Sequence, residues 1–402
     1  MPSPVVKPGG SPEFPKIKIS ARGAKRIKDG HVWVYRSDVV TADGVAAGAV
    51  VQVSDERGKF LGTAFYSTAS QIAIRMISGE MVKDVNELLR ERVRAAVEYR
   101  QRFVSDTDAY RVVFSEADFL PGLIVDRYND LLSFQVLTQA TDAETVRQTV
   151  LSELTEQLHP AAIAERVEAK IRELEQLPTC SSGVVQGDKS STVFSMNGVR
   201  FHYDVKEGQK TGAYLDQREN YAAAAQYAHG EALDVFCYHG GFALHLAKAG
   251  CKVAGVDSSR PALEVADRNA ALNGREIEWI EGNAFDVLRD YQKNGQRYDA
   301  IVLDPPAFAK SKRDLDTALR GYKELNLRAL KMLRPGGILV TCSCSYHVST
   351  AEFLGVVAEA AGDAHRTIRL LESRTQAKDH PILASVPETA YLKCLIGHVS
   401  NL

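Results

Sequence analysis

Two cysteines stand two residues apart at the end of an apolar segment late in the chain. Cys342 and Cys344 lie in the run Thr-Cys-Ser-Cys-Ser, after a Pro-Gly-Gly turn and three apolar residues. A cysteine thiolate is a nucleophile that can form a transient covalent bond with a substrate. In a strand both side chains would face the same side, so periodicity does not choose between them. The structural alternative is that both fill a strand end, because free cysteine is often buried.

An aspartate followed by two prolines ends another apolar segment. This is Asp304, in the run Leu-Asp-Pro-Pro. A carboxyl group there can hydrogen-bond a reacting group or exchange a proton with it. Two prolines directly after it do not suit an aspartate that caps a helix, and they rigidify the loop that follows. We therefore expect Asp304 to work with one of the two cysteines.

Three further apolar segments end in residues suited to binding a nucleoside. Asp234 precedes a glycine-containing turn at Gly240, and Asp257 ends the next segment. An acid in that place can accept hydrogen bonds from the two hydroxyls of an adenosine ribose. Asn283, after the third segment, can face an adenine. Nicotinamide dinucleotide binding is the rival interpretation, but the turn lacks the G-x-G-x-x-G pattern. The structural alternative is that Asp234 and Asp257 are ordinary acids at strand ends without a ligand.

These residues need a sheet whose strands end at one edge. From residue 192 onward, strand patterns occur near 232–237, 252–257, 277–281, 299–304 and 338–343. Helical patterns alternate with them near 241–249, 260–273, 284–293 and 315–332. Such alternation predicts an α/β domain with a parallel sheet and helices on both faces, and ligands bind at the carboxyl ends of its strands. An Asn-Gly pair at 197–198 predicts a hairpin where this region begins.

The first half of the chain has a different pattern. Residues 1–15 hold five of the 14 prolines and are expected to be a disordered leader. Short strand patterns over 16–82 predict a small β-barrel. Residues 83–190 are expected to form a central α+β domain that starts with an amphipathic helix at 84–103. Within it, 161–177 has a helical composition, although its spacing also permits a strand. The third domain is expected at 191–402.

The composition is that of a globular protein without a membrane span. The 402 residues are 45% hydrophobic and 25% charged, and no apolar run approaches a membrane helix in length. Six cysteines are too few for a disulfide scaffold, which favours a reduced, cytoplasmic protein. The net charge is −2, but residues 1–36 carry eight lysines and arginines against two acids, a net +6 that leaves −8 for the rest. This basic segment fits contact with a polyanion, and a solubilising role is an equal alternative.

The strand-end motifs together resemble those of class I S-adenosylmethionine-dependent methyltransferases. From about Lys16 to His398 the chain is similar to the bacterial ribosomal large subunit methyltransferase I family, which makes 5-methylcytosine in 23S rRNA. Two segments carry much of this resemblance, KEGQKTGAYLDQREN at 206–220 and SEADFLPGLIVDRY at 115–128. The module at 16–82 looks like a PUA domain, an RNA-binding fold. The resemblance also implies that 161–177 is partly strand, and it favours a homodimer.

The resemblance implies a Rossmann-like methyltransferase domain with a mostly parallel seven-stranded sheet, preceded by the PUA-like and central domains. S-adenosylmethionine would be the cofactor, and S-adenosylhomocysteine its product. The family's acid in the third motif is replaced by Asn283, whose amide can still hydrogen-bond an adenine. No cysteine and histidine spacing suggests a metal site. The residues implied to bind the cofactor are Lys210, Thr211, Gly212, Asp216, Arg218, Asp234, Phe236, Gly240, Asp257, Ser258, Asn283, Ala284 and Asp304.

The resemblance also implies a covalent reaction on a cytosine. Carbon 5 of cytosine becomes nucleophilic only after a thiolate has added to carbon 6, and Cys342 in Thr-Cys-Ser matches the nucleophile position of pyrimidine carbon-5 methyltransferases. Asp304 would bind the N3 and N4 edge of the ring, and His347 is a candidate for the base that removes the carbon 5 proton. The run Asp-Pro-Pro-Ala-Phe is also similar to that of amino-group methyltransferases, which need no cysteine. A non-catalytic RNA-binding assembly factor is a third interpretation.

Two clusters are predicted to contact RNA. They are Arg22, Lys25, Arg26 and Lys28 in the PUA-like module, and Phe308, Lys310 and Lys312 after the Asp-Pro-Pro motif. The cations suit phosphate contacts, and the phenylalanine suits stacking on a base. The target base must be unstacked to reach a thiol and a methyl donor. The expected partner is therefore single-stranded 23S rRNA or a large-subunit assembly intermediate.

Overall fold

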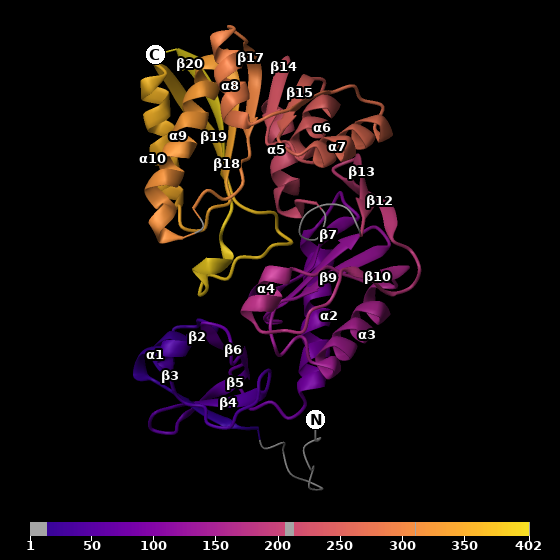
Figure 1. Ribbon diagram of the computed structural model, residues 1–402, viewed down its shortest axis with the longest axis vertical. Coiled ribbons are helices and arrows are strands. Elements are labelled where there is room, and N and C mark those ends of the chain that lie inside the picture. The colour runs from indigo at the N-terminus through magenta and orange to yellow at the C-terminus, as the bar shows by residue number, and fades with distance from the viewer. Residues whose placement is uncertain (1–13, 206–212, 310, 402) are drawn as a thin grey trace.

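The computed structural model describes residues 14–205, 213–309 and 311–401, which form three domains (Figure 1). The N-terminal, central and C-terminal domains are built on sheets of six, five and seven strands respectively. Nearly all of the leader expected at 1–15 lies outside the described residues, as do Lys210, Thr211, Gly212 and Lys310. Across the described parts of the chain, no helix is long and apolar enough to cross a membrane.

The N-terminal domain has the strand order β2-β6-β5-β4-β1-β3. Its strands are β1 (Lys16–Ile19), β2 (Trp33–Tyr35), β3 (Val39–Thr41), β4 (Val50–Asp55), β5 (Phe60–Tyr66) and β6 (Ile72–Ser78). Side chains alternate along each strand, so Val34 of β2 is buried in the core while Trp33 and Tyr35, on either side of it in the strand, are only partly buried.

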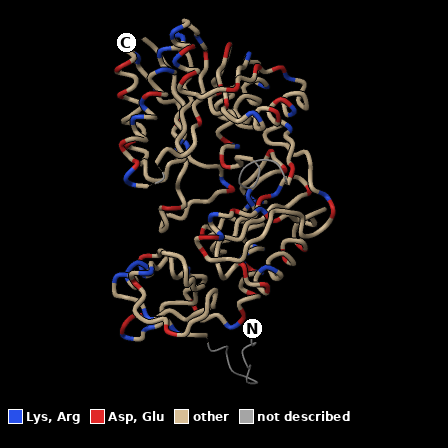
Figure 2. The backbone as a smooth tube through the Cα atoms, viewed as in Figure 1, with Lys and Arg blue, Asp and Glu red and all other residues tan. Residues whose placement is uncertain are grey.

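The sequence pattern predicted only short strands in this domain, and it missed the helix α1 (Ala21–Lys28). Ser20 caps this helix by accepting a hydrogen bond from the Gly23 amide at 3.2 Å. The helix has only eight residues and buries only the small residues Gly23 and Ala24, so its apolar pattern is short and weak in the sequence. The four cations predicted to contact RNA in this domain therefore lie on a helix, and Figure 2 shows basic residues gathered there.

The central domain has the strand order β11-β10-β9-β8-β7. Its elements are α2 (Val85–Phe103), β7 (Ala109–Phe114), β8 (Leu123–Tyr128), β9 (Leu131–Val136), α3 (Glu144–Leu158), β10 (Ala162–Glu165), α4 (Ala169–Leu174) and β11 (Gly183–Gln186). The helix predicted at 84–103 is confirmed, and Asp84 caps it. The ambiguous segment 161–177 contains both a strand and a helix, so each pattern was right for part of it.

The C-terminal domain opens with the predicted hairpin, formed by β12 (Ser191–Met196) and β13 (Val199–Asp204). Asn197 and Gly198 at its tip have φ of 51° and 71°, as an Asn-Gly hairpin turn requires. The helices that follow are α5 (Arg218–Tyr227), α6 (Gly241–Lys248), α7 (Arg260–Leu272), α8 (Ala284–Lys293), α9 (Leu315–Met332) and α10 (Thr350–Asp363). Short 3-10 turns are η1 (Arg36–Asp38), η2 (Ser115–Asp118), η3 (Leu215–Gln217), η4 (Lys312–Asp314) and η5 (Pro387–Thr389).

The seven-stranded sheet has the order β16-β15-β14-β17-β18-β20-β19, in which the last two strands are antiparallel to their neighbours. Its strands are β14 (Glu231–Val235), β15 (Lys252–Asp257), β16 (Glu278–Glu281), β17 (Tyr298–Leu303), β18 (Leu333–Ser343), β19 (Arg366–Arg374) and β20 (Lys393–Asn401). Alternate residues along the strands join two cores, one with α5, α6 and α7 and one with α8, α9 and α10 (Figure 1). The predicted α/β sheet with helices on both faces is confirmed.

The direction of strand order reverses between β14 and β17. The chain steps from β14 outward to β15 and β16, and then returns to the other side of β14 with β17 and β18. A crevice forms at such a switch point beyond the carboxyl ends of the strands. The motif residues predicted from the sequence lie at these ends, so this edge of the sheet is the candidate site.

Candidate active site

A tight turn directly after β14 borders the crevice. Phe236, Tyr238 and Gly240 have φ of 67°, 48° and 85°, which is the left-handed region that non-glycine residues rarely adopt. The amides of Phe236 and Cys237 both donate to the Val256 carbonyl of the next strand, at 2.8 and 3.0 Å. A β-carbon at Gly240 would lie 3.0 Å from the Trp279 ring. The turn is therefore held in one conformation by its neighbours.

Two carboxylates at neighbouring strand ends are positioned by backbone amides. Asp234 is buried, and its Oδ2 accepts from the Ala243 amide at 2.8 Å while its Oδ1 has no hydrogen-bond partner among the described residues. Burial raises the pKa of Asp234 to about 7. Asp257 accepts from the Tyr238 amide at 3.0 Å and from the Ser259 amide at 2.9 Å. Both acids are thus oriented toward the same strand-end region.

The remaining residues predicted to bind a cofactor have varied surroundings. Asn283 caps α8 by accepting from the Phe285 amide at 3.0 Å, which leaves its amide nitrogen available. Ala284 is the buried first residue of that helix, and Ser258 is exposed beside Asp257. Asp216 accepts from the Tyr391 hydroxyl at 2.6 Å through Oδ2, and its buried Oδ1 has no hydrogen-bond partner among the described residues.

Arg218 has a structural partner that the sequence did not reveal. Its guanidinium donates to both carboxylate oxygens of Asp379, at 2.9 and 3.1 Å, and its side chain is only 2% exposed. The Asp379 side chain is fully buried, and although burial opposes it, His380 and Arg218 lower its carboxyl pKa. This ion pair fastens the segment before β20 to the start of α5, and the cofactor-binding role of Arg218 stays a prediction.

Asp304 lies directly after β17, at the other side of the switch point. Nε2 of Gln217 donates to its Oδ1 at 3.0 Å, and the Oε1 of that glutamine accepts from Asn220 at 2.7 Å. Burial, together with nearby Asp216 and Asp234, raises the pKa of Asp304 to about 8. At neutral pH this carboxyl group is therefore mostly protonated and can donate a hydrogen bond. Gln217 was not singled out from the sequence, although it stands in the 206–220 segment that carries the family resemblance.

The structure separates the two candidate cysteines, because β18 ends at Ser343. Cys342 lies inside the sheet opposite Cys394, with no exposed surface. Burial, and after it Cys394, raises the pKa of the Cys342 thiol well above its ordinary value. Cys344 lies beyond the strand, is partly exposed, and places its Sγ 3.8 Å from the Pro305 carbonyl. The argument from the two-residue period of a strand therefore does not extend to Cys344. Cys342, which the resemblance implied as the nucleophile, is a buried thiol whose raised pKa favours the protonated form.

A buried lysine lies beside Cys344. Lys393 begins β20 opposite Ser343, and its Nζ donates to the Ser345 carbonyl at 2.6 Å and to the Tyr391 carbonyl at 2.9 Å. Burial lowers the pKa of Lys393 to about 8, and nearby Cys344 opposes this shift. Lys393 and Cys344 therefore interact electrostatically. Nothing in the sequence pattern distinguished this lysine from a surface residue.

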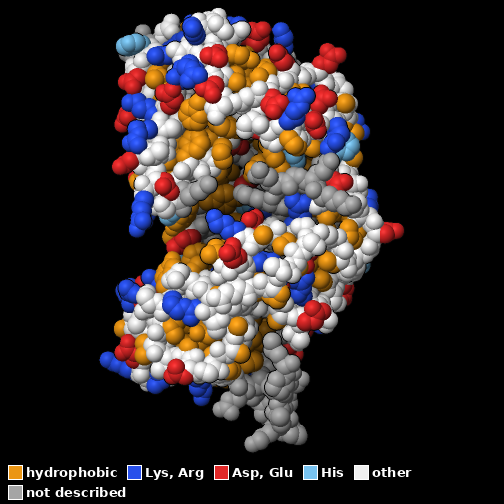
Figure 3. Space-filling model, viewed as in Figure 1, with side chains coloured by type: hydrophobic (Ala, Val, Ile, Leu, Met, Phe, Trp, Pro, Cys, Tyr) orange, Lys and Arg blue, Asp and Glu red, His pale blue; other side chains and the backbone are white. Residues whose placement is uncertain are grey.

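A cavity of about 550 Å³ opens beside these strand ends. It is lined by residues of all three domains, and Figure 3 shows hydrophobic side chains along the hollow between them. Tyr214 lines the cavity, and among the groups that raise its hydroxyl pKa, after burial and Tyr238, are Asp304 and Cys344. The cavity thus adjoins the carboxyl and thiol groups at the ends of β17 and β18.

The four cations on α1 that are predicted to contact RNA already have acidic partners. Arg22 and Arg26 pair with the buried Asp38 at 2.6 and 3.2 Å. Lys25 pairs with Asp29 at 2.5 Å, and Lys28 lies 3.9 Å from Asp55. The two lysines remain 76% and 52% exposed, and exposed ion pairs of this kind exchange readily for other anions. Both lysines are therefore available to a phosphate.

The loop after Asp304 packs one of the residues predicted to contact RNA against two helices. The centre of the Phe308 ring lies 4.9 Å from that of Tyr322 and 6.1 Å from that of Phe285, and Phe308 is not among the residues that line the cavity. Phe308 is half-buried and packs the loop against α8 and α9, and its contact with RNA stays a prediction. Lys312 is exposed in η4. His347 is half-buried, with its ring edge-on to Tyr346.

Comparison with known proteins identifies the family of this chain. Residues 17–79 match the PUA-like domain family, and residues 118–396 match the S-adenosylmethionine-dependent methyltransferase family. Ribosomal RNA large subunit methyltransferase I of Shewanella amazonensis is 38% identical over 395 residues, which cover 96% of this chain and 99% of the relative. This chain belongs to the ribosomal RNA large subunit methyltransferase I family. The member from Tolumonas auensis is 39% identical and covers 91% of this chain and 94% of its own.

Solved structures agree with the family fold. The Streptococcus mutans protein described as an S-adenosylmethionine-dependent methyltransferase has a TM-score of 0.81 at 19% identity, covering 96% of this chain and all of that one. SMU.776, solved in complex with S-adenosylhomocysteine, has a TM-score of 0.82 at 19% identity with the same coverage. These likenesses show that the fold is shared over nearly the whole chain, and the two family matches identify a PUA-like domain followed by a methyltransferase domain, as the resemblance implied.

S-adenosylmethionine is the cofactor of this methyltransferase family, and the crevice fits it. The cofactor carries an ammonium group and two ribose hydroxyls, all of which donate hydrogen bonds. Buried Oδ1 atoms of Asp234 and Asp216 lack partners among the described residues, and an unpaired buried oxygen is costly unless a ligand donates to it. Asp257, the last residue of β15, is placed to accept hydrogen bonds from the ribose hydroxyls. These three acids would hold the cofactor.

Proposed function

We propose that this methyltransferase methylates carbon 5 of a cytosine in the large-subunit (23S) rRNA through a covalent cysteine adduct at carbon 6. The observation that carries the proposal is the proximity of the Cys344 thiol to the Asp-Pro-Pro loop at the ends of β17 and β18. The names of the relatives support rRNA as the substrate. The PUA-like domain supports RNA as the class of ligand.

The chemistry explains why a thiol and an acid are needed together. Carbon 5 of cytosine is too weak a nucleophile to take a methyl group until a thiolate has added to carbon 6 and made the ring an enamine. Bound S-adenosylmethionine supplies an electrophilic methyl group on a sulfonium sulfur. Once carbon 5 is methylated, a base removes the proton there, the bond between sulfur and carbon 6 breaks, and the thiolate leaves.

Cys344 is the better nucleophile of the two cysteines. A thiol must reach carbon 6 of an extruded base, and Cys344 is partly exposed whereas Cys342 is buried within the sheet. The thiolate is the reactive form, and burial disfavours it at Cys342. Lys393 places a positive charge next to Cys344 and so favours its thiolate. We therefore assign the nucleophile to Cys344 and a supporting structural role to Cys342.

Asp304 is suited to protonate or hydrogen-bond the ring as the thiolate adds. Addition at carbon 6 moves electron density to N3, which is an acceptor in neutral cytosine. A carboxyl group whose pKa is about 8 carries a proton at neutral pH and can donate it to N3. Gln217 holds one carboxyl oxygen, which orients the other. Nucleophile and acid would thus act on the ring from two neighbouring strand ends.

The test is the identity of the methylated nucleoside. Purified enzyme, labelled S-adenosylmethionine and large-subunit rRNA lacking its natural methylations are incubated, and the RNA is digested for mass spectrometry. We expect labelled 5-methylcytidine from the wild-type protein, none from Cys344→Ala, and normal cofactor binding by that variant. Cys342→Ala is the matched control and should keep most of its turnover.

The main alternative, methylation of a ring or exocyclic nitrogen, gives a different outcome in the same experiment. A nitrogen nucleophile attacks without covalent help, so product would be an N-methylated nucleoside and Cys344→Ala would remain active. No transfer at all, despite RNA binding, would favour a non-catalytic RNA-binding factor. Either result would overturn the proposed reaction.

A further inference from the structure

We propose that the cavity between the three domains is a stacking site for an unpaired base of single-stranded RNA, with Trp33 and Tyr35 of the PUA-like domain as its platform. The inference rests on the proposed function in that it takes RNA to be the substrate. It adds that the PUA-like domain contributes directly to the chamber beside the active site, and that its contribution there is aromatic.

The lining of the cavity is unusually aromatic. Its rings come from the PUA-like domain, the central domain and the methyltransferase domain, and they are Trp33, Tyr35, Phe114, Tyr214, Tyr238, Tyr346 and Tyr391. Aromatic faces stack on any base, because every base has a π face. A volume of about 550 Å³ lies in the usual range for small-ligand sites. Size and lining therefore both suit one nucleotide base.

The platform rings are held in place before any ligand arrives. Strand alternation turns Trp33 and Tyr35 to the same face of β2, and both line the cavity. Nε1 of Trp33 donates to Glu116 of the central domain at 3.0 Å. The Arg26 guanidinium lies 4.7 Å from the centre of the Tyr35 ring. Rings that are already ordered lose little conformational entropy when a base stacks on them.

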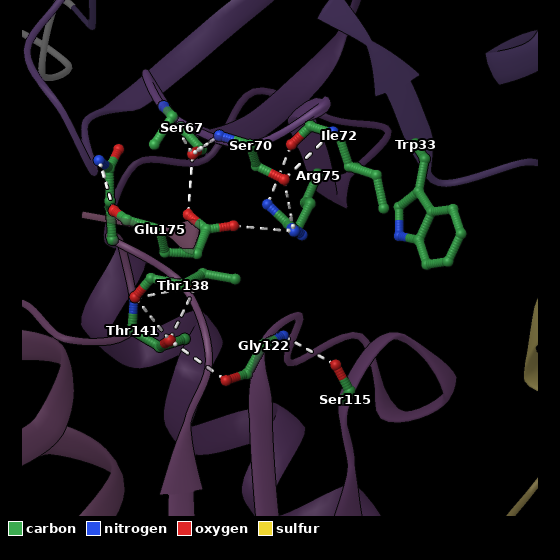
Figure 4. A network of polar contacts seen from close by, with 12 residues as sticks. Trp33, Ser67, Ser70, Ile72, Arg75, Ser115, Gly122, Thr138, Thr141 and Glu175 are labelled. Atoms are coloured by element: carbon green, nitrogen blue, oxygen red, sulfur yellow. Dashed lines mark hydrogen bonds and ion pairs between the residues drawn. The ribbon is translucent and has the colours of Figure 1, made fainter. Parts of the chain in front are cut away.

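A polar network between two domains fixes where this platform stands (Figure 4). Arg75 of β6 lies 3.5 Å from Glu116 and 3.3 Å from Glu175, and the hydroxyl of Ser67 donates to Glu175 at 2.8 Å. Glu175 is nearly fully buried, and breaking a buried pair of this kind is costly. The network holds the PUA-like domain against the central domain, so the position of Trp33 relative to the active site is set by the fold.

Among the described residues that line the cavity, the one arginine is bound to a carboxylate, which favours a base over a phosphate. Arg111 donates to both carboxylate oxygens of Asp126 at 2.8 and 3.0 Å. Glu388 lies 3.2 Å from His31, and Asp216 accepts from Tyr391. A phosphate would need an available cation there, whereas an uncharged base needs ring faces and edges. The phosphates then remain outside, within reach of surface lysines such as those on α1.

The occupant is a neighbour of the target nucleotide. Asp304 and Cys344, which act on the target base, do not line the cavity, whereas Tyr214 lines it and interacts electrostatically with both of them. A base next to the target can therefore stack on the platform while the target base occupies the strand ends. Holding a flanking base keeps the target nucleotide unstacked.

Binding measurements with the full-length protein test this inference. A fluorescein-labelled single-stranded RNA that contains the target cytosine is titrated with protein at several salt concentrations. We expect Trp33→Ala to weaken binding roughly 5- to 150-fold, the range measured for loss of one base stack, and to leave the slope of log K against log salt unchanged. The double variant Lys25→Ala/Lys28→Ala should instead flatten that slope, by about 0.7 for each lost phosphate contact.

Two further arms separate stacking from a structural effect. Trp33→Phe keeps a ring but loses the bond to Glu116, so it should retain most of the affinity. An RNA that is abasic at the flanking position should bind the wild-type protein more weakly than intact RNA does. The Trp33→Ala variant should bind the abasic RNA and the intact RNA with the same affinity. Unchanged affinity of Trp33→Ala, or equal losses in Trp33→Phe and Trp33→Ala, would overturn the stacking site. Failure of the wild-type protein to bind RNA at low salt would overturn the proposed function as well.

Discussion

Nε2 of Gln217 donates a hydrogen bond to Oδ1 of Asp304, and this bond joins the turn before α5 to the loop after β17. The amide cannot usefully reverse, because its Oε1 already accepts from Asn220. The orientation of the acid therefore depends on a glutamine that is itself fixed by a neighbour. Several consequences for pH dependence, stability and reactivity follow from this arrangement and from the groups around it.

The pH dependence of turnover should report Asp304. Because its protonated form is the one that donates to the ring, we expect kcat/KM to fall as pH rises through about 8. Gln217→Leu removes a hydrogen bond that lowers this pKa, so the alkaline limb should move to higher pH. Gln148→Leu, on the exposed side of α3, is the control and should leave the profile in place. An alkaline limb that stays fixed in Gln217→Leu would mean that another group controls it.

Stability should show the cost of keeping Asp304 in this place. Its pKa is about 8 in the folded protein and 3.8 in a model peptide, so the folded state binds the extra proton between these values. Because the unfolded chain releases this proton and the folded protein keeps it, the free energy of unfolding falls as pH rises from about 4 to 8. We expect Asp304→Asn to have the wild-type Tm near pH 4 and to be more stable at pH 9, on the order of 2 kcal/mol after solvent screening. Scanning calorimetry across pH measures this, and a constant difference would contradict it.

Alkylation should identify the reactive thiol and the influence of Lys393. Iodoacetamide at graded pH, followed by peptide mass mapping, should modify Cys344 and leave Cys342 unmodified in the folded protein. Lys393→Met removes the neighbouring positive charge, so the midpoint for Cys344 should rise by about one pH unit. Lys323→Met, on α9 and paired with Glu359 and Asp363, should have no effect on this midpoint. Faster labelling of Cys342 than of Cys344 would refute the assignment.

The ion pair of Arg218 and Asp379 should be structural. Removing one member leaves a buried charge without its partner, so Arg218→Met and Asp379→Asn should each cost about 3–5 kcal/mol of folding free energy. The double variant should lose less than the sum of the two. Urea unfolding of the four proteins gives the coupling, and calorimetry gives cofactor affinity. A variant Arg218→Met that folds normally but cannot bind S-adenosylmethionine would support the role predicted from the sequence.

Much of the fold could be predicted because periodicity reports burial. The strands that end in Asp234, Asp257 and Asp304 are buried on both faces, and their apolar runs alternate clearly with helices. The Asn-Gly hairpin was equally clear, because the turn requires residues that tolerate positive φ. The helix α1 left only a weak signal, since it buries only two small residues.

The site could be predicted only in part, because spacing does not reveal where a strand ends. Cys342 and Cys344 are equivalent in a repeating strand, and the end of β18 at Ser343 is what makes them different. Gln217 and Lys393 act through contacts with residues far away in the chain, which no local pattern records. The aromatic cavity has the same origin, since its lining comes from three domains.

The central claim is that Cys344 forms a covalent bond with carbon 6 of the target cytosine, and a mechanism-based trap tests it most directly. In RNA carrying 5-fluorocytidine at the target position, the fluorine cannot be removed as a proton, so the adduct persists after methylation. With S-adenosylmethionine present, we predict a complex of wild-type protein and RNA that survives denaturing electrophoresis, with the crosslink mapped by mass spectrometry to Cys344. Cys342→Ala should give the same complex and Cys344→Ala none. A crosslink on Cys342, or full turnover without any adduct, would contradict the account.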